Sequence, residues 1–287
     1  MNSLLQLIQK IKELDHASSF HPKRKCDTGY PQWDEVEKLI NLYKEIIFPQ
    51  FFSVHLFNPL FEDDFLSHKL FQLKIHLQRI LLKAFCFECF DDSNDCHVHS
   101  TYIDETIHHF LNAIPRVKEL LITDIEATYL GDPAAKSREE VLLCYPGIQA
   151  MIHYRIAHGF YRLNVPILPR MITELAHSKT GIDIHPGATI GRFFAMDHGT
   201  GIVIGETTII GENVKIYQGV TLGAKSFPLD EHGNPVKGIP RHPIVEDNVV
   251  IYANATILGR VTIGKNSIIG ANTWITTDVP PDSKVSI

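Results

Sequence analysis

Asp183 and His198 are the two residues of this chain whose types and spacing best suit acid–base chemistry. They are 15 residues apart. A carboxylate that orients an imidazole and stabilises its protonated form makes that imidazole a base for a hydroxyl group. The same two residues could instead bind backbone groups in turns, as aspartate often does. Spacing alone leaves both interpretations open, so the choice depends on the elements that carry the residues.

A second candidate site is the run Cys86-x2-Cys89-x6-Cys96-His97-x-His99, which offers the ligands that tetrahedral zinc prefers. Structural zinc sites normally pair two such knuckles at fixed spacing, and the second knuckle is missing here. Cys86 and Cys89 also end an apolar helical stripe, where buried thiols act as small hydrophobic groups. We therefore predict no metal site, and the role of this cluster stays open.

An aliphatic residue at every sixth position indicates the elements that position Asp183 and His198. One series begins at Val245, and another lies upstream with a single shift of two positions; the members are Ile184, Ile190, Met196, Ile202, Ile204, Ile210, Ile216, Leu222, Val245, Ile251, Ile257, Ile263, Ile269 and Ile275. A period of six is typical of a hexapeptide-repeat parallel β-helix, in which about 18 residues form one coil. An irregular β-sandwich is disfavoured because its strands alternate with period two. Residues 15 apart then lie near one corner of neighbouring coils, which favours contact between Asp183 and His198.

Residues 1–180 show helical spacing instead. Apolar stripes predict helices over 65–87, over 102–130 with a break at Pro115, over 146–163 and over 166–177. The predicted fold class is therefore α+β. An N-terminal α-helical domain, residues 1–180, is followed by a C-terminal left-handed parallel β-helix of hexapeptide repeats, residues 181–287.

The six-residue period fails between Leu222 and Val245. This stretch is rich in glycine and proline, so it predicts an inserted loop, residues 223–243, rather than a further face of the coil. Long loops inside a regular repeat are usually functional. The loop ends in Arg241-His242, a cationic pair at the point where the chain re-enters the repeat.

The composition is that of an ordinary globular protein. Hydrophobic residues make up 44% and charged residues 21% of the chain, and the formal net charge of -6 disfavours a nucleic-acid or membrane surface. No apolar run is long enough to span a bilayer, and the N-terminus lacks a signal-peptide pattern. Five cysteines without framework spacing indicate reduced thiols. We therefore expect a cytoplasmic protein with neither nucleic-acid nor membrane partners.

The strongest indication of function is a set of motifs in and before the repeats. They are Asp124-Ile-x-Ala127, Asp132-Pro-Ala134, Gly147-x-x-Ala150, Tyr154-Arg-Ile-x-His158, Asp183-Ile-His-Pro-x-Ala-x-Ile-Gly-Arg192, Asp197-His198-x-Thr-Gly-Ile-Val-x-Gly-Glu-Thr207, Gln218-x-Val-Thr-Leu-Gly223 and Arg241-His-Pro243. Hexads alone would indicate only the large hexapeptide acyltransferase superfamily. With these motifs, the chain resembles serine O-acetyltransferase over residues 120–280.

The resemblance implies an acyltransferase that moves an acetyl group from acetyl-CoA to the hydroxyl of L-serine. The products would be O-acetyl-L-serine and CoA, in the first step of cysteine biosynthesis from serine. His198 is then the general base, and Asp183 orients its ring. Acetyl-CoA is a co-substrate, and no tightly bound cofactor is expected.

The resemblance also implies residues for the zwitterionic substrate. Asp132 and Asp197 match the family's positions for the serine ammonium, and Arg241 and His242 match those that face the serine carboxylate. The residue types agree, because arginine suits bidentate carboxylate recognition and aspartate suits an ammonium. Asp132 could equally be a turn residue before Pro133, and Arg241 a surface charge.

Acetyl-CoA in this superfamily lies in a groove between neighbouring subunits. The matching small residues are Gly223, Ala253 and Ala271, although simple corner geometry would also explain them. The groove implies a homotrimer, and the family's helical half usually joins two trimers into a hexamer; trimer and hexamer both stay open here. The C-terminal Ile287 resembles the residue by which the family docks into O-acetylserine sulfhydrylase, although its tail is shorter than usual.

Three other functions compete with this one. A gamma-class carbonic anhydrase would bind zinc through paired histidines, but His198 and His242 have no nearby companion. A non-catalytic scaffold would leave Asp183, Asp197 and His198 without a joint role. A sugar-nucleotide acetyltransferase would not need the charge set of Asp132, Asp197 and Arg241.

Overall fold

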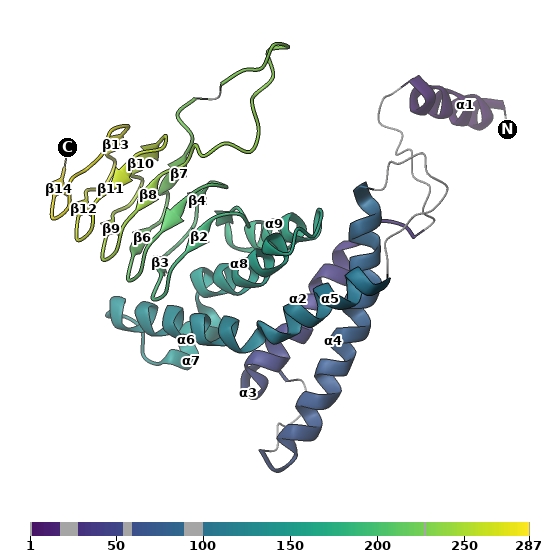
Figure 1. The fold of residues 1–287 in the computed structure, drawn as a ribbon, viewed down its shortest axis with the longest axis horizontal. Coiled ribbons are helices and arrows are strands. Elements are labelled where there is room, and N and C mark those ends of the chain that lie inside the picture. Colours follow the sequence, from purple (N-terminus) through teal and green to yellow (C-terminus); the bar gives the residue numbers. More distant parts are fainter. Residues whose placement is uncertain (1, 18–27, 54–58, 89–99, 227, 287) are drawn as a thin grey trace.

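The computed structural model describes residues 2–17, 28–53, 59–88, 100–226 and 228–286. Helices occupy the chain up to Thr180, and short strands occupy it from Asp183 onward (Figure 1). Gly181, in the left-handed region at φ 70°, ends the last helix between the two parts. The predicted order, a helical part followed by a parallel β-helix of hexapeptide repeats, is confirmed. In the described part of the chain, no helix is long and apolar enough to cross a membrane.

The helical elements agree largely with the predicted ones. They are α1 (Asn2–Ala17), α2 (Trp33–Ile47), α3 (Pro49–Phe52), η1 (Pro59–Phe61), α4 (Glu62–Phe85), η2 (Cys86–Glu88), α5 (Ser100–Asn112), α6 (Ile114–Gly131), α7 (Arg138–Cys144), α8 (Pro146–Arg162) and α9 (Leu168–Thr180). Pro115 lies in the first turn of α6, so the predicted break is where α5 ends. The predicted start of the last helix at Pro166 was wrong by two residues, because Ile167 has a non-helical φ of 52°. Cys89, Cys96, His97 and His99 lie outside the described residues.

The strands form three parallel sheets, one for each side of a triangular coil. Sheet A contains β1 (Asp183–Ile184), β4 (Val203–Ile204), β7 (Thr221–Gly223), β10 (Thr256–Leu258) and β13 (Trp274–Ile275). Sheet B contains β2 (Thr189–Ile190), β5 (Ile209–Ile210), β8 (Ile244–Val245) and β11 (Thr262–Ile263). Sheet C contains β3 (Ala195–Asp197), β6 (Lys215–Tyr217), β9 (Val250–Ile251), β12 (Ile268–Ile269) and β14 (Lys284–Val285). The aliphatic residue of each hexad points into the core, as the period predicts.

The register of sheet A shows where the repeat departs from regularity. Asp183 pairs with Val203, twenty residues later, whereas Val203 pairs with Thr221, eighteen residues later. The first corner between sheets C and A therefore has two additional residues, and this corner carries His198. The second departure is the segment between β7 and β8, which leaves the coil at the corner between sheets A and B (Figure 1).

The corner between sheets B and C is built from residues in the left-handed region. Asn213, Asn248, Asn266 and Asp282 have φ values of 58–60°, a conformation that asparagine and aspartate tolerate better than most residues. Their side chains form a ladder along the coil axis. Each asparagine Nδ2 donates to Oδ1 of the next residue, at 2.8, 3.0 and 2.8 Å in order.

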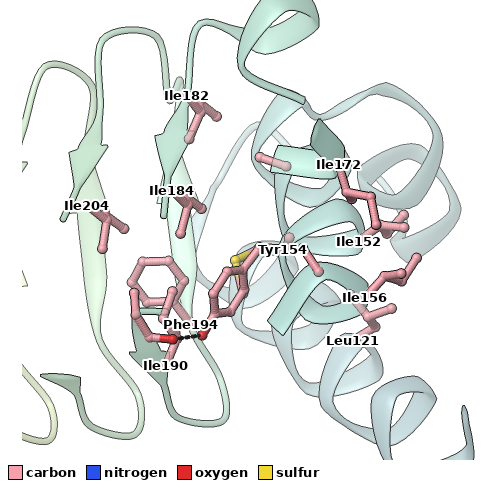
Figure 2. Packing of buried hydrophobic residues seen from close by; sticks show 14 of the residues in the cluster. Leu121, Ile152, Tyr154, Ile156, Ile172, Ile182, Ile184, Ile190, Phe194 and Ile204 are labelled. Atoms are coloured by element: carbon pink, nitrogen blue, oxygen red, sulfur yellow. Dashed lines mark hydrogen bonds between the residues drawn. The ribbon is translucent and has the colours of Figure 1, made fainter. Parts of the chain in front are cut away.

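Helices α6 and α8 cover the open edge of the first coil. The Tyr154 hydroxyl donates to Ala188 O at 2.6 Å, and the Arg155 guanidinium donates to Ile190 O and Gly191 O, each at 2.6 Å. Tyr154 lies between the isoleucines of the helices and those of the coils (Figure 2). Arg155 also forms a buried ion pair with Asp124 of α6, with N–O distances of 3.0 and 3.1 Å. These bonds satisfy edge carbonyls that would otherwise be unpaired, and they fix α6 against the coil.

Candidate active site

A small cavity lies between the C-terminal end of α6 and the outer face of sheet C. It is lined by Thr128, Asp132, Tyr145, Ala195, Met196, Asp197 and Lys215. Two residues that the sequence assigns to an ammonium site, Asp132 and Asp197, therefore line one cavity. Tyr145 and Lys215 also line it, and the sequence analysis missed both.

Asp132 owes its position to the end of α6. It caps the helix in an extended conformation, φ -116° and ψ 110°, which the following Pro133 favours. Its Oδ2 accepts a 2.6 Å bond from the Tyr145 hydroxyl, and its Oδ1 accepts a 2.8 Å bond from the Ala134 amide. The bond from Tyr145 is the largest cause that lowers the pKa of Asp132, and the same bond raises the pKa of Tyr145 to about 12. Asp132 is thus an anion at neutral pH.

Asp197 ends β3 and faces a lysine on the next coil. The Lys215 Nζ lies 3.0 Å from Asp197 Oδ2 and donates a 2.7 Å bond to Gly131 O. Burial acts to lower the pKa of Lys215, but its bonds to Tyr217 and Asp197 outweigh burial and raise it. Lys215 pairs in register with Ala195, two residues before Asp197, so both charged side chains are on the same outer face. The period-two alternation of these strands was the signal that could have revealed Lys215.

His198 directly follows Asp197, in the enlarged corner. It has a φ of 58°, and its side chain is 73% exposed, with Nε2 3.8 Å from Asp197 Oδ1. Asp183 is one coil away on β1, where the Arg170 guanidinium approaches its Oδ1 at 3.5 Å. Among the described residues, no hydrogen bond or ion pair joins Asp183 to His198, so the orienting role of Asp183 stays a prediction.

The carboxylate of Asp183 also lies beside Glu174 and His177 of α9. One ligand atom from each of the three residues falls within 4.8 Å of the others. Arg170 forms ion pairs with Glu174 at 2.5 Å and with Asp183 at 3.5 Å, so one protein cation already lies between the two carboxylates.

Arg241 and His242 lie at the corner between sheets A and B. The Arg241 Nη2 bonds to Glu206 Oε2 at 2.7 Å. The His242 Nδ1 accepts a 3.1 Å bond from the Thr207 amide, which places the proton of the neutral ring on Nε2. Burial, followed by the charge of Arg241, lowers the pKa of His242 to about 4. The expectation of a cationic pair was therefore wrong, because only Arg241 is charged at neutral pH.

The three small residues assigned to acetyl-CoA divide between the same two corners. The Ala253 carbonyl accepts a 2.9 Å bond from Asn272, so Ala253 and Ala271 are neighbours at the corner between sheets C and A. This is the corner of His198, with Ala253 two coils and Ala271 three coils further along. Gly223 instead ends β7, and its carbonyl accepts a 3.0 Å bond from Gly259 near the corner between sheets A and B.

Predicted site residues thus form two groups, one near each end of β4. The acidic group, with Asp197 and His198, precedes β4, and Arg241 and His242 bond to Glu206 and Thr207, which follow it. A triangular coil of hexapeptide repeats with polar side chains gathered at its corners defines the class of hexapeptide transferases. The bacterial transferase hexapeptide family (six repeats) matches residues 242–277, and the N-terminal part of serine acetyltransferase matches residues 58–152.

Comparisons with individual proteins narrow this class. A "serine acetyltransferase, plasmid" from Synechococcus elongatus is 57% identical over 189 residues, which cover 66% of this chain and 59% of that protein. The structure of serine acetyltransferase isoform 3 from Entamoeba histolytica, in complex with cysteine, is 35% identical with a TM-score of 0.73, covering 100% of this chain and 93% of that one. A serine acetyltransferase in complex with CoA is 28% identical with a TM-score of 0.55, covering 88% and 95%. The chain belongs to the serine acetyltransferase family.

Proposed function

We propose that this protein transfers the acetyl group of acetyl-CoA to the hydroxyl of L-serine, giving O-acetyl-L-serine and CoA. This would be the first step of cysteine biosynthesis from serine. The observation that carries the proposal is the placement of Asp132 and Asp197 around one cavity, directly beside the exposed imidazole of His198. An amino acid whose ammonium lies against these two carboxylates would present its short side chain to His198.

The chemistry then requires a single base. The imidazole of His198 takes the proton of the serine hydroxyl while the oxygen attacks the thioester carbon. The tetrahedral intermediate breaks its carbon–sulfur bond, and the imidazolium returns the proton to the leaving CoA sulfur. The exposure of the His198 ring supports this role, because the ring can turn between the two substrates. Asp183 would orient the His198 ring once the Asp183 carboxylate is released from Arg170.

The carboxylate of serine would be recognised by Arg241 and His242. Arg241 supplies the charge, and the Nε2 proton of neutral His242 supplies a hydrogen bond. Within one chain these residues and His198 lie at opposite ends of β4. A complete site therefore needs the acidic group of one copy and the Arg241 group of a second copy. Three copies around an axis would form three such sites, which supports a homotrimer.

Acetyl-CoA would lie along the corner between sheets C and A. From one coil to the next, the residues at this corner are His198, Gly219, Ala253 and Ala271. Backbone hydrogen bonds of 2.9–3.0 Å join the successive coils there. Small residues leave that backbone open to the pantetheine amides, and Gly223 would line the opposite wall from the neighbouring copy. The relative solved with CoA supports acetyl-CoA as the co-substrate.

Three further proposals concern the surroundings of the enzyme. If the assembly is a hexamer, the helical part would join two trimers. The mass of the assembly in solution distinguishes a trimer from a hexamer. Ile287, outside the described residues, would dock into O-acetylserine sulfhydrylase, and a chain lacking Ile287 should then lose co-elution with that enzyme. The cysteine spacing, which follows no disulfide framework, supports a cytoplasmic protein.

A thiol-release assay tests the proposed activity. The chain is mixed with acetyl-CoA and either L-serine, homoserine or an amino sugar, and CoA thiol is followed with a colorimetric reagent. We expect turnover that depends on serine, and at least a 100-fold loss of kcat in His198→Ala with an unchanged oligomer. Turnover with amino sugars alone, or full activity in His198→Ala, contradicts the proposal.

A further inference from the structure

A second polar cavity, of about 240 Å³, lies in the helical part, away from the coils. Its polar lining includes Glu37 and Lys44 of α2, Cys144 at the end of α7, Gln149 and His153 of α8, and Lys179 of α9. The proposed reaction uses none of these residues. The cavity is thus a separate feature, built where α2, α8 and α9 meet.

The charges of this cavity do not balance. Lys179 forms an ion pair with Glu37, and His153 donates from Nδ1 to Gln149 O at 2.7 Å. Burial lowers the pKa of His153 to about 4, so this ring is neutral at pH 7. Lys44 donates a 2.6 Å bond to the neutral amide oxygen of Gln149. Among the described lining residues, no carboxylate is left to neutralise Lys44.

An unneutralised lysine in a partly buried site is unfavourable unless something else supplies the negative charge. Burial, followed by repulsion from Lys179, lowers the pKa of Lys44 to about 8. The ammonium still carries most of its charge at pH 7. An anion in the cavity would lower the free energy of this charge, and the cavity has room for a small molecule.

We propose that this cavity binds a small oxyanion, a carboxylate or a phosphate group, through the Lys44 ammonium, with Lys179 at the rim. Binding in this cavity would also strengthen serine binding at the acidic site. This second part of the proposal rests on the proposed function. Cys144 lines the cavity, and the next residue, Tyr145, donates the 2.6 Å bond to Asp132. An occupant restrains the junction of α7 and α8, holds Tyr145 on Asp132, and tightens serine binding.

Calorimetric titration of the full chain tests the binding. Acetate and inorganic phosphate are titrated separately at constant ionic strength in chloride, and the tighter of the two shows which group the cavity prefers. We expect saturable binding that is at least about tenfold weaker in Lys44→Met, because a charge-assisted bond is lost. Lys44→Arg should retain binding, and Lys38→Met, an exposed change on the same helix, should not alter it. Absence of saturable binding, or equal binding in Lys44→Met, overturns the proposal; equal binding would place the anion at a cation other than Lys44.

The pH dependence of acetate binding gives a second test, since acetate keeps one charge between pH 7 and 9. Glu37 of the same helix, and Cys144, His153 and Lys179 of the surrounding helices, line the cavity with Lys44. A thiol ordinarily titrates in this range, so the measurement uses the Cys144→Ser background. Affinity should fall as pH rises through about 8 and Lys44 loses its charge. A flat profile contradicts a role for Lys44.

The serine KM tests the connection to the acidic site. Saturating anion should lower the serine KM of the unmodified chain and leave that of Lys44→Met unchanged. If the anion binds while the serine KM stays constant, the connection through Tyr145 is wrong. A chain without acetyltransferase activity would refute the proposed function and leave the calorimetric result to decide on the cavity.

Discussion

The Lys215 ammonium lies 3.0 Å from the carboxylate of Asp197, so the acidic site contains a cation of its own. The same Nζ donates to Gly131 O, the residue before Asp132. One lysine on β6 therefore connects the two aspartates assigned to the substrate ammonium. It joins the end of a helix to the outer face of the coil.

The variant Lys215→Met tests this connection. It removes a charge-assisted bond to Asp197 and the bond to Gly131, so Asp132 and Asp197 lose their fixed separation. We expect the serine KM to rise about tenfold, with a smaller change in kcat, and Lys215→Arg to recover part of the loss. Steady-state kinetics measure both constants. A lower serine KM would show instead that Lys215 competes with the substrate ammonium.

The variant Tyr145→Phe tests the hydrogen bond to Asp132. This bond lowers the pKa of Asp132, so it stabilises the fold above the ordinary pKa of aspartate and does so less as pH falls through the lowered value. We expect Tyr145→Phe to be less stable than the parent by about 1 kcal/mol at pH 7, with a smaller gap below pH 4. Urea unfolding at several pH values measures this gap. If this stability difference between parent and variant does not change with pH, the Tyr145 hydroxyl stabilises the fold without Asp132.

The variant Arg155→Met tests the buried bridge between helices and coil. It leaves Asp124, fully buried, without its partner, and frees the carbonyls of Ile190 and Gly191. We expect a loss of about 3–5 kcal/mol in the free energy of unfolding. The matched control is Arg138→Met, which breaks the exposed pair with Glu126 and should cost far less, because solvent screens that pair. Equal losses in the two variants would refute the structural role of the bridge.

The variant Gly205→Ala tests how His242 is held. A Cβ at this position would lie 2.0 Å from Cδ2 and 2.2 Å from Nε2 of the His242 ring, so the ring must move. We expect kcat/KM for serine to fall at least tenfold while the coil remains folded. Gly159→Ala in α8 is the control, because its nearest atom is 3.7 Å away, and it should be neutral or slightly stabilising. Unchanged kinetics in Gly205→Ala would remove His242 from the site.

The coil was the part most readily predicted from sequence. Its inward residues repeat strictly, and each repeat contacts only its neighbours, so one period specifies the architecture. The shift of two positions in the series, between Ile202 and Ile204, falls in the enlarged corner that carries His198. The start of α9 was mistaken because a positive φ at Ile167 has no sequence signal of the kind that glycine gives.

The site was only partly predictable, because its charges are set by neighbours distant in sequence. Burial makes His242 neutral, and burial depends on the packing of Gly205 and the inserted loop. The partner of Arg241 is Glu206, 35 residues earlier, which the sequence analysis did not assign to the site. Asp183 faces Arg170 because α9 packs against β1, a contact that spacing along the coils does not contain.

The asparagine ladder along the corner between sheets B and C has a direction. Every Nδ2 donates toward the C-terminal end, and the last residue, Asp282, accepts from Asn266 through its Oδ1. A carboxylate has no hydrogen to donate, so the ladder has no donor to offer beyond Asp282. The Asp282 carboxylate therefore ends this series of amide donors, and Asp282→Asn would add an unused donor at its last position.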